Sequence, residues 1–306
     1  MRYIIFLIYT LFSIGSVSYA QKAKKVTDIK SDNLFGQIKT IQTIEYTALI
    51  DANKMQKGER ISSTFKQYNF AGFLLESSEY NPDSSLMQKE IFEYDKKNNR
   101  ITELLYTESD KIDQRIEIKY NTLHLPVKMF TKDDKGRVFQ KTTFLYDERS
   151  NLTLQTGYDE RGKMAEKSYY SYDDKGNLIL YTGYGEFDNR KISYQYDKDN
   201  RIIQSVCIDI QGNFVEKITY QYENSPQSVR KTYLNKDDKP LKSELCIFDT
   251  YDNLLEITLF NEQGAVTEKH TFSYQYDEKQ NWTVLITYAD SDKKAISITE
   301  RVIEYY

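Results

Sequence analysis

Residues 170–178 read Tyr-Ser-Tyr-Asp-Asp-Lys-Gly-Asn-Leu, and variants of this stretch recur along the chain. In each variant an aromatic residue precedes a short run of Asp, Asn, Lys or Gly, and successive copies lie about 26 residues apart. Such a fixed period is typical of a tandem-repeat protein. The aromatic anchors of the repeats are Tyr94, Tyr120, Tyr146, Tyr172, Tyr196, Tyr222, Phe248 and Tyr276, with outlying copies at Tyr46, Tyr68 and Tyr305.

Two turn signals recur within each unit. Gly or Asp lies ten residues before many anchors, as Gly136 and Asp238 do, and Asn lies five residues after many others, as Asn177 and Asn281 do. Gly and Asn tolerate positive φ, so tight turns favour them at fixed positions. Between the turns, runs of about 8–10 residues alternate polar and apolar side chains, which predicts two antiparallel strands per unit.

The alternation also predicts two faces. Counting back from an anchor, even positions are aromatic or aliphatic, as Ile192 and Tyr194 are before Tyr196. Counting forward, even positions place Leu178 and Tyr184 on the same apolar face. The other face is polar, with a basic residue five before six anchors: Lys89, Arg115, Lys141, Lys167, Lys191 and Lys217.

We therefore expect an all-β protein of tandem antiparallel β-hairpin repeats, about ten units of ~26 residues. At about 4.8 Å per strand, 20 strands make a sheet roughly 95 Å wide. A twisted sheet this wide curls. The sequence thus predicts a curled or superhelical sheet with the aromatic face inside.

The N-terminus predicts export. Arg2 precedes an apolar stretch, and Ser18 and Ala20 provide small residues before a cleavage point at Gln21. We expect a signal peptide at 1–20, a lead-in strand and half-repeat at 21–45, and the repeat domain at 46–306. The mature chain has no segment predicted to cross a membrane as a helix, and we expect it in the periplasm, on the outer surface or secreted.

The stretch 172–178, Tyr-Asp-Asp-Lys-Gly-Asn-Leu, resembles the YD repeats of RHS-type secreted bacterial proteins. Weaker copies begin at Tyr146, Tyr196 and Tyr276, and the resemblance covers most of 46–305. It implies a coiled sheet of β-hairpins and an association with surface recognition, including sugar binding. The chain is too short for the closed shells that large members form, and the repeat pattern continues to Tyr305 without a separate toxin segment.

Residues suited to catalysis or metal binding are few. His124 in a turn and His270 on a strand form no ligand motif, and we expect both at the surface. The acidic turns, such as Asp173-Asp174, lack the spacing of a calcium loop. We expect no cofactor, no metal and no enzymatic activity.

Cys207 and Cys246 invite a disulfide in an exported protein. Cys246 lies two before Phe248 on the aromatic face, whereas Cys207 lies eleven after Tyr196, an odd position that predicts the opposite face. Because they also lie about three strands apart, we expect no bridge between them.

The interval 172–196 is the densest in aromatic residues, and a ligand that stacks on rings would contact Tyr181, Tyr184, Phe187 and Tyr194. The alternative is that the tyrosines repeated along the aromatic face, which we call the tyrosine ladder, form the packed interior, since aromatic cross-strand pairs stabilise sheets.

Function is predicted only broadly. The net charge is −4 with both signs interspersed, which argues against nucleic acid. We expect a non-catalytic scaffold that binds an envelope or host protein, or alternatively a carbohydrate-binding module that uses its aromatic face. An outer-membrane barrel is a further alternative, but Glu300 and Glu304 share a face of the last strand where lipid would require apolar residues.

Overall fold

The computed structural model describes residues 26–51, 54–186, 188–224, 227–289 and 294–306. The predicted signal peptide and Phe187 lie outside these residues. Within them, one short helix, α2 (Asp28–Ser31), precedes 20 strands that follow the chain as one continuous meander. The strands are β1 (Ile38–Asp51), β2 (Lys54–Tyr68), β3 (Leu74–Tyr80), β4 (Leu86–Tyr94), β5 (Arg100–Tyr106), β6 (Ile112–Tyr120), β7 (Pro126–Asp133), β8 (Val138–Tyr146), β9 (Leu152–Tyr158), β10 (Met164–Tyr172), β11 (Leu178–Gly185), β12 (Arg190–Tyr196), β13 (Ile202–Asp209), β14 (Phe214–Asn224), β15 (Gln227–Leu234), β16 (Pro240–Phe248), β17 (Leu254–Asn261), β18 (Val266–Tyr276), β19 (Trp282–Ala289) and β20 (Lys294–Tyr305).

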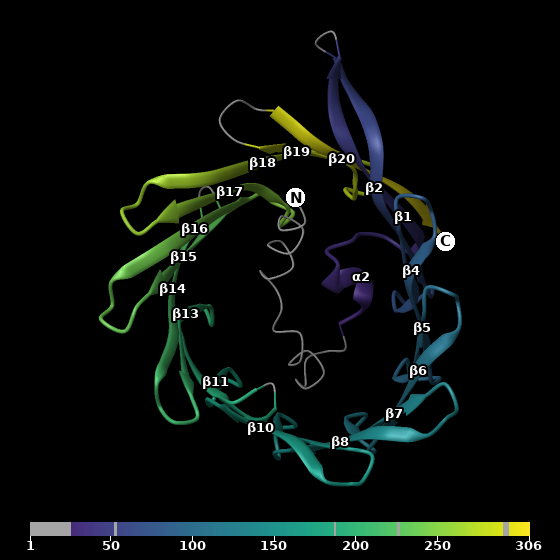
Figure 1. Ribbon diagram of the computed structural model, residues 1–306, viewed down its shortest axis with the longest axis vertical. Helices are drawn as coiled ribbons and strands as arrows, with labels where there is room; N and C mark the ends of the chain where they lie inside the picture. The colour runs from purple at the N-terminus through teal and green to yellow at the C-terminus, as the bar shows by residue number, and fades with distance from the viewer. Residues whose placement is uncertain (1–25, 52–53, 187, 225–226, 290–293) are drawn as a thin grey trace.

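The sheet closes into a barrel, so the predicted open, curled or superhelical sheet is wrong (Figure 1). Strand β1 pairs with β2 on one side and with β20 on the other, with Ile41 opposite Ile303. The prediction of 20 strands and their hairpin pairing is confirmed. The repeat pattern, however, describes each hairpin unit and does not show that the first and last strands of the sheet pair with each other. Closure pairs the N–H and C=O groups that two free edges would have exposed.

The closing seam has side-chain contacts of its own. Asn281 is 2% exposed; its Oδ1 accepts the N–H of Phe35 at 2.8 Å, and its Nδ2 donates to the carbonyl of Phe35 at 2.8 Å. The same Nδ2 also lies 2.7 Å from the hydroxyl of Tyr305. On the other surface of the seam, Lys39 pairs with Glu304 at 2.8 Å. These contacts fasten Phe35, just before β1, to the turn between β18 and β19, and they join β1 to β20.

Fifteen of the hairpin turns share one geometry, which the turn after Tyr172 illustrates. Asp173 N–H donates to the carbonyl of Asn177 at 2.9 Å, and Gly176 N–H donates to the carbonyl of Asp173 at 3.1 Å. Gly176 has φ +87°, a left-handed conformation that suits glycine. Asn177 was predicted to hold the positive φ, and that is wrong. It instead donates its amide to Asp173 Oδ2 at 2.9 Å, while Oδ1 accepts the backbone N–H groups of Lys175 and Asn177.

A register shift follows these turns. Ser171 pairs with Leu180, but Tyr172 pairs with Leu178, so one extra residue is present on β11. Equivalent shifts occur beside Tyr94, Tyr196 and Phe248. Such a β-bulge interrupts the alternation of faces along the strand.

Candidate functional site

The two faces of the sheet become an inner and an outer wall. Helix α2 lies inside the ring (Figure 1) and contacts Tyr68, Ile41 and Ile303, so these residues line the inner wall. Directly paired residues on neighbouring strands point to the same side. Following the pairs around the barrel therefore assigns the eight repeat anchors, Tyr68 and Tyr305 to the inner wall, as the sequence predicted for the aromatic face. The outlying anchor Tyr46 lies on the outer wall instead, on the same face of the seam as Glu300.

The anchor tyrosines hold the wall together. The hydroxyls of Tyr146 and Tyr196 each donate at 2.7 Å to a carbonyl on the preceding strand, that of Pro126 and of Leu178 respectively. Burial raises the pKa of Tyr196 to about 12, so its hydroxyl remains a protonated donor even in moderately alkaline solution. These contacts support packing as the role of the ladder and leave the hydroxyls of these anchors engaged.

The four aromatic residues proposed for ligand stacking do not form one site. Tyr181 and Tyr194 lie on the inner wall and pack against the same core of Leu152, Tyr170 and Leu178. Tyr184 is paired with Lys167, and its ring contacts Tyr169 at 6.1 Å on the outer wall. Phe187 lies outside the described residues. The bulge at the start of β11 reverses the parity that had assigned Tyr184 to the aromatic face.

A corresponding bulge at the start of β13 corrects the prediction for Cys207. Cys207 is paired with Ile192, and both Cys207 and Cys246 lie on the inner wall, so the prediction of opposite faces is wrong. Both thiols are free and buried. Burial raises the pKa of Cys246 to about 11 and that of Cys207 above its ordinary value.

The candidate site lies on the inner wall of β9–β12, where three glycines leave room for neighbouring polar side chains. Glu166 on β10 is paired with Gly157 on β9 and with Gly185 on β11, so its two neighbours in the row lack side chains. A Cβ at Gly157 would lie 2.4 Å from Glu166 Cγ, which shows that the Glu166 side chain lies over this glycine. The Glu166 side chain is nevertheless exposed. We call this region, together with Gly183, the glycine recess.

A second carboxylate lies beside it. Asp188 accepts a hydrogen bond from the hydroxyl of Tyr181 and forms an ion pair with Arg190 at 2.9 Å. Gly183 makes room for this pair, because a Cβ there would lie 2.6 Å from Asp188 Oδ2 and 2.8 Å from the hydroxyl of Tyr181. Burial, followed by the hydrogen bond to Asp188, raises the pKa of Tyr181 well above its usual range. The recess thus combines one fastened carboxylate with the exposed carboxylate of Glu166.

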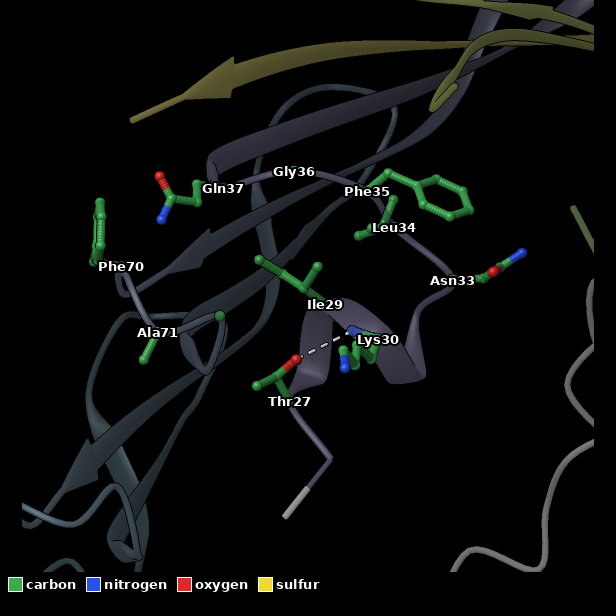
Figure 2. Close-up of a pocket in the computed structure, with 11 residues that line it drawn as sticks. Thr27, Ile29, Lys30, Asn33, Leu34, Phe35, Gly36, Gln37, Phe70 and Ala71 are labelled. Carbon is green, nitrogen blue, oxygen red and sulfur yellow. Dashed lines mark hydrogen bonds between the residues drawn. The ribbon is translucent and has the colours of Figure 1, made fainter. Parts of the chain in front are cut away.

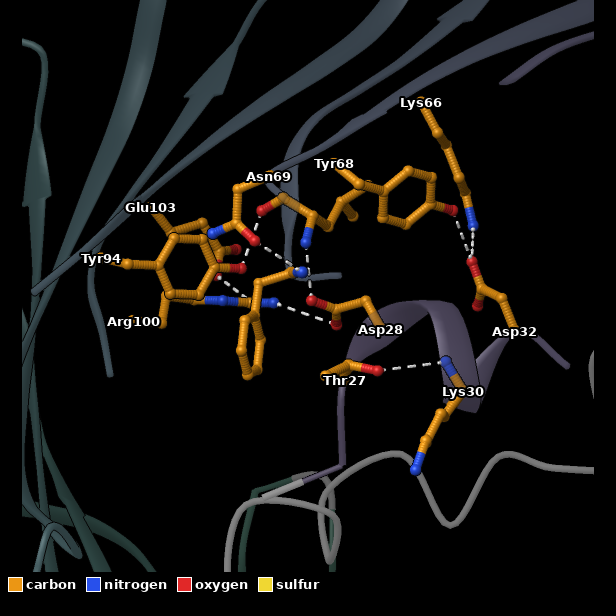
Figure 3. A network of polar contacts seen from close by, with 12 residues as sticks. Thr27, Asp28, Lys30, Asp32, Lys66, Tyr68, Asn69, Tyr94, Arg100 and Glu103 are labelled. Carbon is orange, nitrogen blue, oxygen red and sulfur yellow. Dashed lines mark hydrogen bonds and ion pairs between the residues drawn. The ribbon is translucent and has the colours of Figure 1, made fainter. Parts of the chain in front are cut away.

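Helix α2 is attached to a different part of the inner wall (Figure 3). Asp28 accepts the N–H of Leu74 at 2.8 Å and lies 3.7 Å from the guanidinium of Arg100. Asp32 accepts from Lys66 at 2.7 Å and from the hydroxyl of Tyr68 at 3.1 Å. The helix is therefore fastened at both ends to β2–β5.

An open pocket of about 670 Å³ lies between the α2 segment and the turn before β3 (Figure 2). Its walls include Ile29, Leu34, Phe35 and Phe70. Lys30 is the one ionisable side chain among its described lining residues. This lining suits packing of chain segments better than binding of a charged ligand.

The remaining candidates have structural placements. His124 is the positive-φ residue of its turn, and His270 is 7% exposed on the inner wall beside Glu268, so the surface placement predicted for His270 is wrong. Across the described ranges, no group of three or more His, Cys, Asp or Glu could hold a metal ion. The part of the chain that the structure describes also has no helix long and apolar enough to cross a membrane.

Comparisons with known proteins give no family. No family model matches the chain, and no curated protein matches it. Among solved structures, the chain is similar to TcdB2-TccC3-TEV, with 13% identity, 86% of this chain covered and a TM-score of 0.40. It is also similar to a porin-like protein from Bacteroides uniformis, with 11% identity, 88% of this chain and 98% of that chain covered, and a TM-score of 0.37. The chain spans 16% of the length of TcdB2-TccC3-TEV. The resemblance to YD repeats stays a prediction.

Proposed function

We propose that this protein is a non-catalytic binding barrel of the bacterial cell envelope that takes a basic segment of another envelope or host protein against the glycine recess. The observation that supports this most directly is Glu166, an exposed carboxylate on the inner wall between two glycines. Side chains from a 20-stranded wall do not fill a barrel about 30 Å in diameter, so the recess faces space in which a ligand could lie.

The chemistry of the recess favours binding over catalysis. Asp188 is already held by Tyr181 and Arg190, so it is an acceptor in a fixed ion pair and not a free base. Glu166 is left to attract a cationic group, with Ser168 on the same strand and the same wall. A Lys or Arg side chain of an extended peptide matches this combination of charge and hydrogen-bonding groups.

Carbohydrate binding on the inner aromatic face is less well supported. Stacking on a sugar needs exposed ring faces, whereas the ladder rings pack against one another and their hydroxyls are largely engaged.

The outer wall favours an aqueous surrounding. Lys89, Lys141, Glu300 and Glu304 point outward from the middle or end of their strands. A Lys on a lipid-facing barrel wall costs about 2–4 kcal/mol at the bilayer midplane. We therefore propose that the barrel works in the periplasm, on the outer surface or as a secreted protein.

The test is binding of a fluorescein-labelled hexalysine peptide, as a model of a basic segment, measured by fluorescence anisotropy. We expect Glu166→Gln to weaken binding several-fold, because it removes the exposed carboxylate of the recess. The matched control is Glu160→Gln, which removes the same charge from an exposed turn next to β10 and should leave affinity unchanged. Equal effects of the two variants, or no binding by the wild type, would contradict the proposal.

A further inference from the structure

The outer wall of β6–β12 holds an unusual set of lysines. By register, five of them point outward in the middle of the wall: Lys119, Lys128, Lys141, Lys167 and Lys191. We call this set the lysine wall. On β7–β12, the described residues that point outward include no Asp or Glu. On β6, Glu117 points outward and is ion-paired at 2.6 Å with Lys132, a further outward lysine of β7. The protein as a whole has a net charge of −4, so the positive charge is concentrated here.

Two of these lysines are directly opposed. Lys119 is paired with Lys128 on the neighbouring strand. Like charges at such a cross-strand position destabilise a sheet. Lys119 lies 5.8 Å from the ring centre of Phe130, and an anionic ligand would relieve the repulsion between the two ammonium groups.

Aromatic rings alternate with the lysines. Lys141 Nζ lies 5.2 Å from the ring centre of Tyr158, and Lys167 Nζ lies 4.9 Å from that of Tyr169. Tyr169 and Tyr184 are 40% and 41% exposed, so both present ring surface to solvent. A surface of this kind offers ammonium groups to anions and ring faces to the C–H faces of sugar units.

The spacing of the lysines indicates an extended ligand. Lys141 to Lys167, and Lys167 to Lys191, are each steps of two strands across and two residues along, or about 12 Å. Ammonium groups that extend straight outward from backbone positions so far apart are too distant for a single phosphate or carboxylate to contact both. A chain with one anionic group per repeating unit can contact each in turn.

The shape of the wall argues further against a membrane surface. Closure makes the outer wall convex, and the five strands from β8 to β12 cover about a quarter of a circumference of roughly 95 Å. A flat bilayer touches only part of such an arc, whereas a flexible polymer follows it. Duplex DNA has one negative charge per about 1.7 Å of axis, far denser than the lysines here.

We propose that the lysine wall binds an anionic polysaccharide, with Lys141, Lys167 and Lys191 contacting successive acidic sugar units and Tyr169 and Tyr184 stacking on the sugar rings. This site is separate from the glycine recess, which lies on the opposite side of the same strands. The ligand-stacking role predicted for Tyr184 thus belongs to the outer wall.

The experiment measures binding of polygalacturonate to the mature chain by affinity electrophoresis at low salt. The test variant combines Lys141→Gln, Lys167→Gln and Lys191→Gln. Its affinity should fall about tenfold or more, since it loses three charge contacts on an exposed surface. Adding Tyr184→Ser should weaken binding further, which a purely electrostatic attraction would not predict.

The matched control combines Lys39→Gln, Lys57→Gln and Lys269→Gln. These lysines also point outward, but each is paired with an acidic residue elsewhere on the barrel: Glu304, Glu300 and Glu256. The control loses the same three charges and should bind polygalacturonate within about twofold of the wild type. Equal losses in the two triple variants would overturn the proposal. Equal binding to neutral dextran, or tighter binding to oligo-dT or to phosphatidylglycerol vesicles, would also overturn it.

Discussion

Replacing Asn281 by Ala should open the barrel at its seam. The Asn281 side chain makes three hydrogen bonds of 2.7–2.8 Å, two to the backbone of Phe35 and one to the hydroxyl of Tyr305, and it is almost fully buried. Alanine leaves the N–H and C=O of Phe35 without these partners. At about 1 kcal/mol per hydrogen bond, and more where a buried group stays unpaired, we expect a loss of about 3–4 kcal/mol.

The matched variant for this test is Asn177→Ala. Asn177 occupies the same place in its own repeat, but it is half-buried and bonds to the side chains of Asp173 and Asn200. Its loss should cost about 1 kcal/mol. Urea unfolding followed by the fluorescence of Trp282, next to the seam, gives both values. A cost for Asn281→Ala no greater than that for Asn177→Ala would refute the view that this amide fastens the seam.

Three further predictions concern burial and protonation. Tyr68→Ala should cost about 3–5 kcal/mol because Tyr68 is fully buried beneath α2, whereas Tyr196→Ala, at a half-buried ring, should cost about 2 kcal/mol. Urea midpoints of the two variants would show this order, and a reversed order would contradict it. The Cys246 thiol, with a pKa of about 11, should resist iodoacetamide at pH 8 in the folded protein and react in urea, and rapid labelling without urea would count against its burial. The hydrogen bond from Asn177 lowers the pKa of Asp173, so the stability from this turn is present above about pH 4 and is lost as the pH falls through the lowered pKa. The urea midpoint of Asp173→Asn should therefore fall less between about pH 5 and 3 than that of the wild type. The same fall in both proteins would contradict this.

The sequence predicts the repeating hairpin unit better than it predicts closure of the sheet into a barrel. The period of the anchors yields the strands and their order because each hairpin is encoded by contiguous residues. Closure depends instead on how the twist of all the units adds up and on contacts such as that between Asn281 and Phe35. Those residues lie 246 positions apart, and no local pattern marks them as partners.

The candidate sites were missed for a specific physical reason. A single extra residue at the start of β11 moves Tyr184 to the outer wall, and the corresponding shift places Cys207 inside. Simple alternation cannot detect a bulge. The glycine recess had a signal, since Gly157, Gly183 and Gly185 lie within strands, where glycine often marks a close approach of side chains. The lysine wall was visible as a polar stripe, but the absence of outward acidic residues from the described part of β7–β12 emerges only from the pairing of the strands.

The closed meander also has a consequence for the order of folding. Hairpin neighbours such as Thr143 and Thr156 are 13 residues apart, whereas Thr40 and Glu304 at the seam are 264 apart. The entropy of closing the longer loop costs about 3 kcal/mol more if the intervening chain is disordered. Once the intervening hairpins have formed, most of that disorder is gone and the two ends are held near each other. Assembly should therefore proceed unit by unit, with the joining of the first and last strands as a late step that responds to the number of repeats.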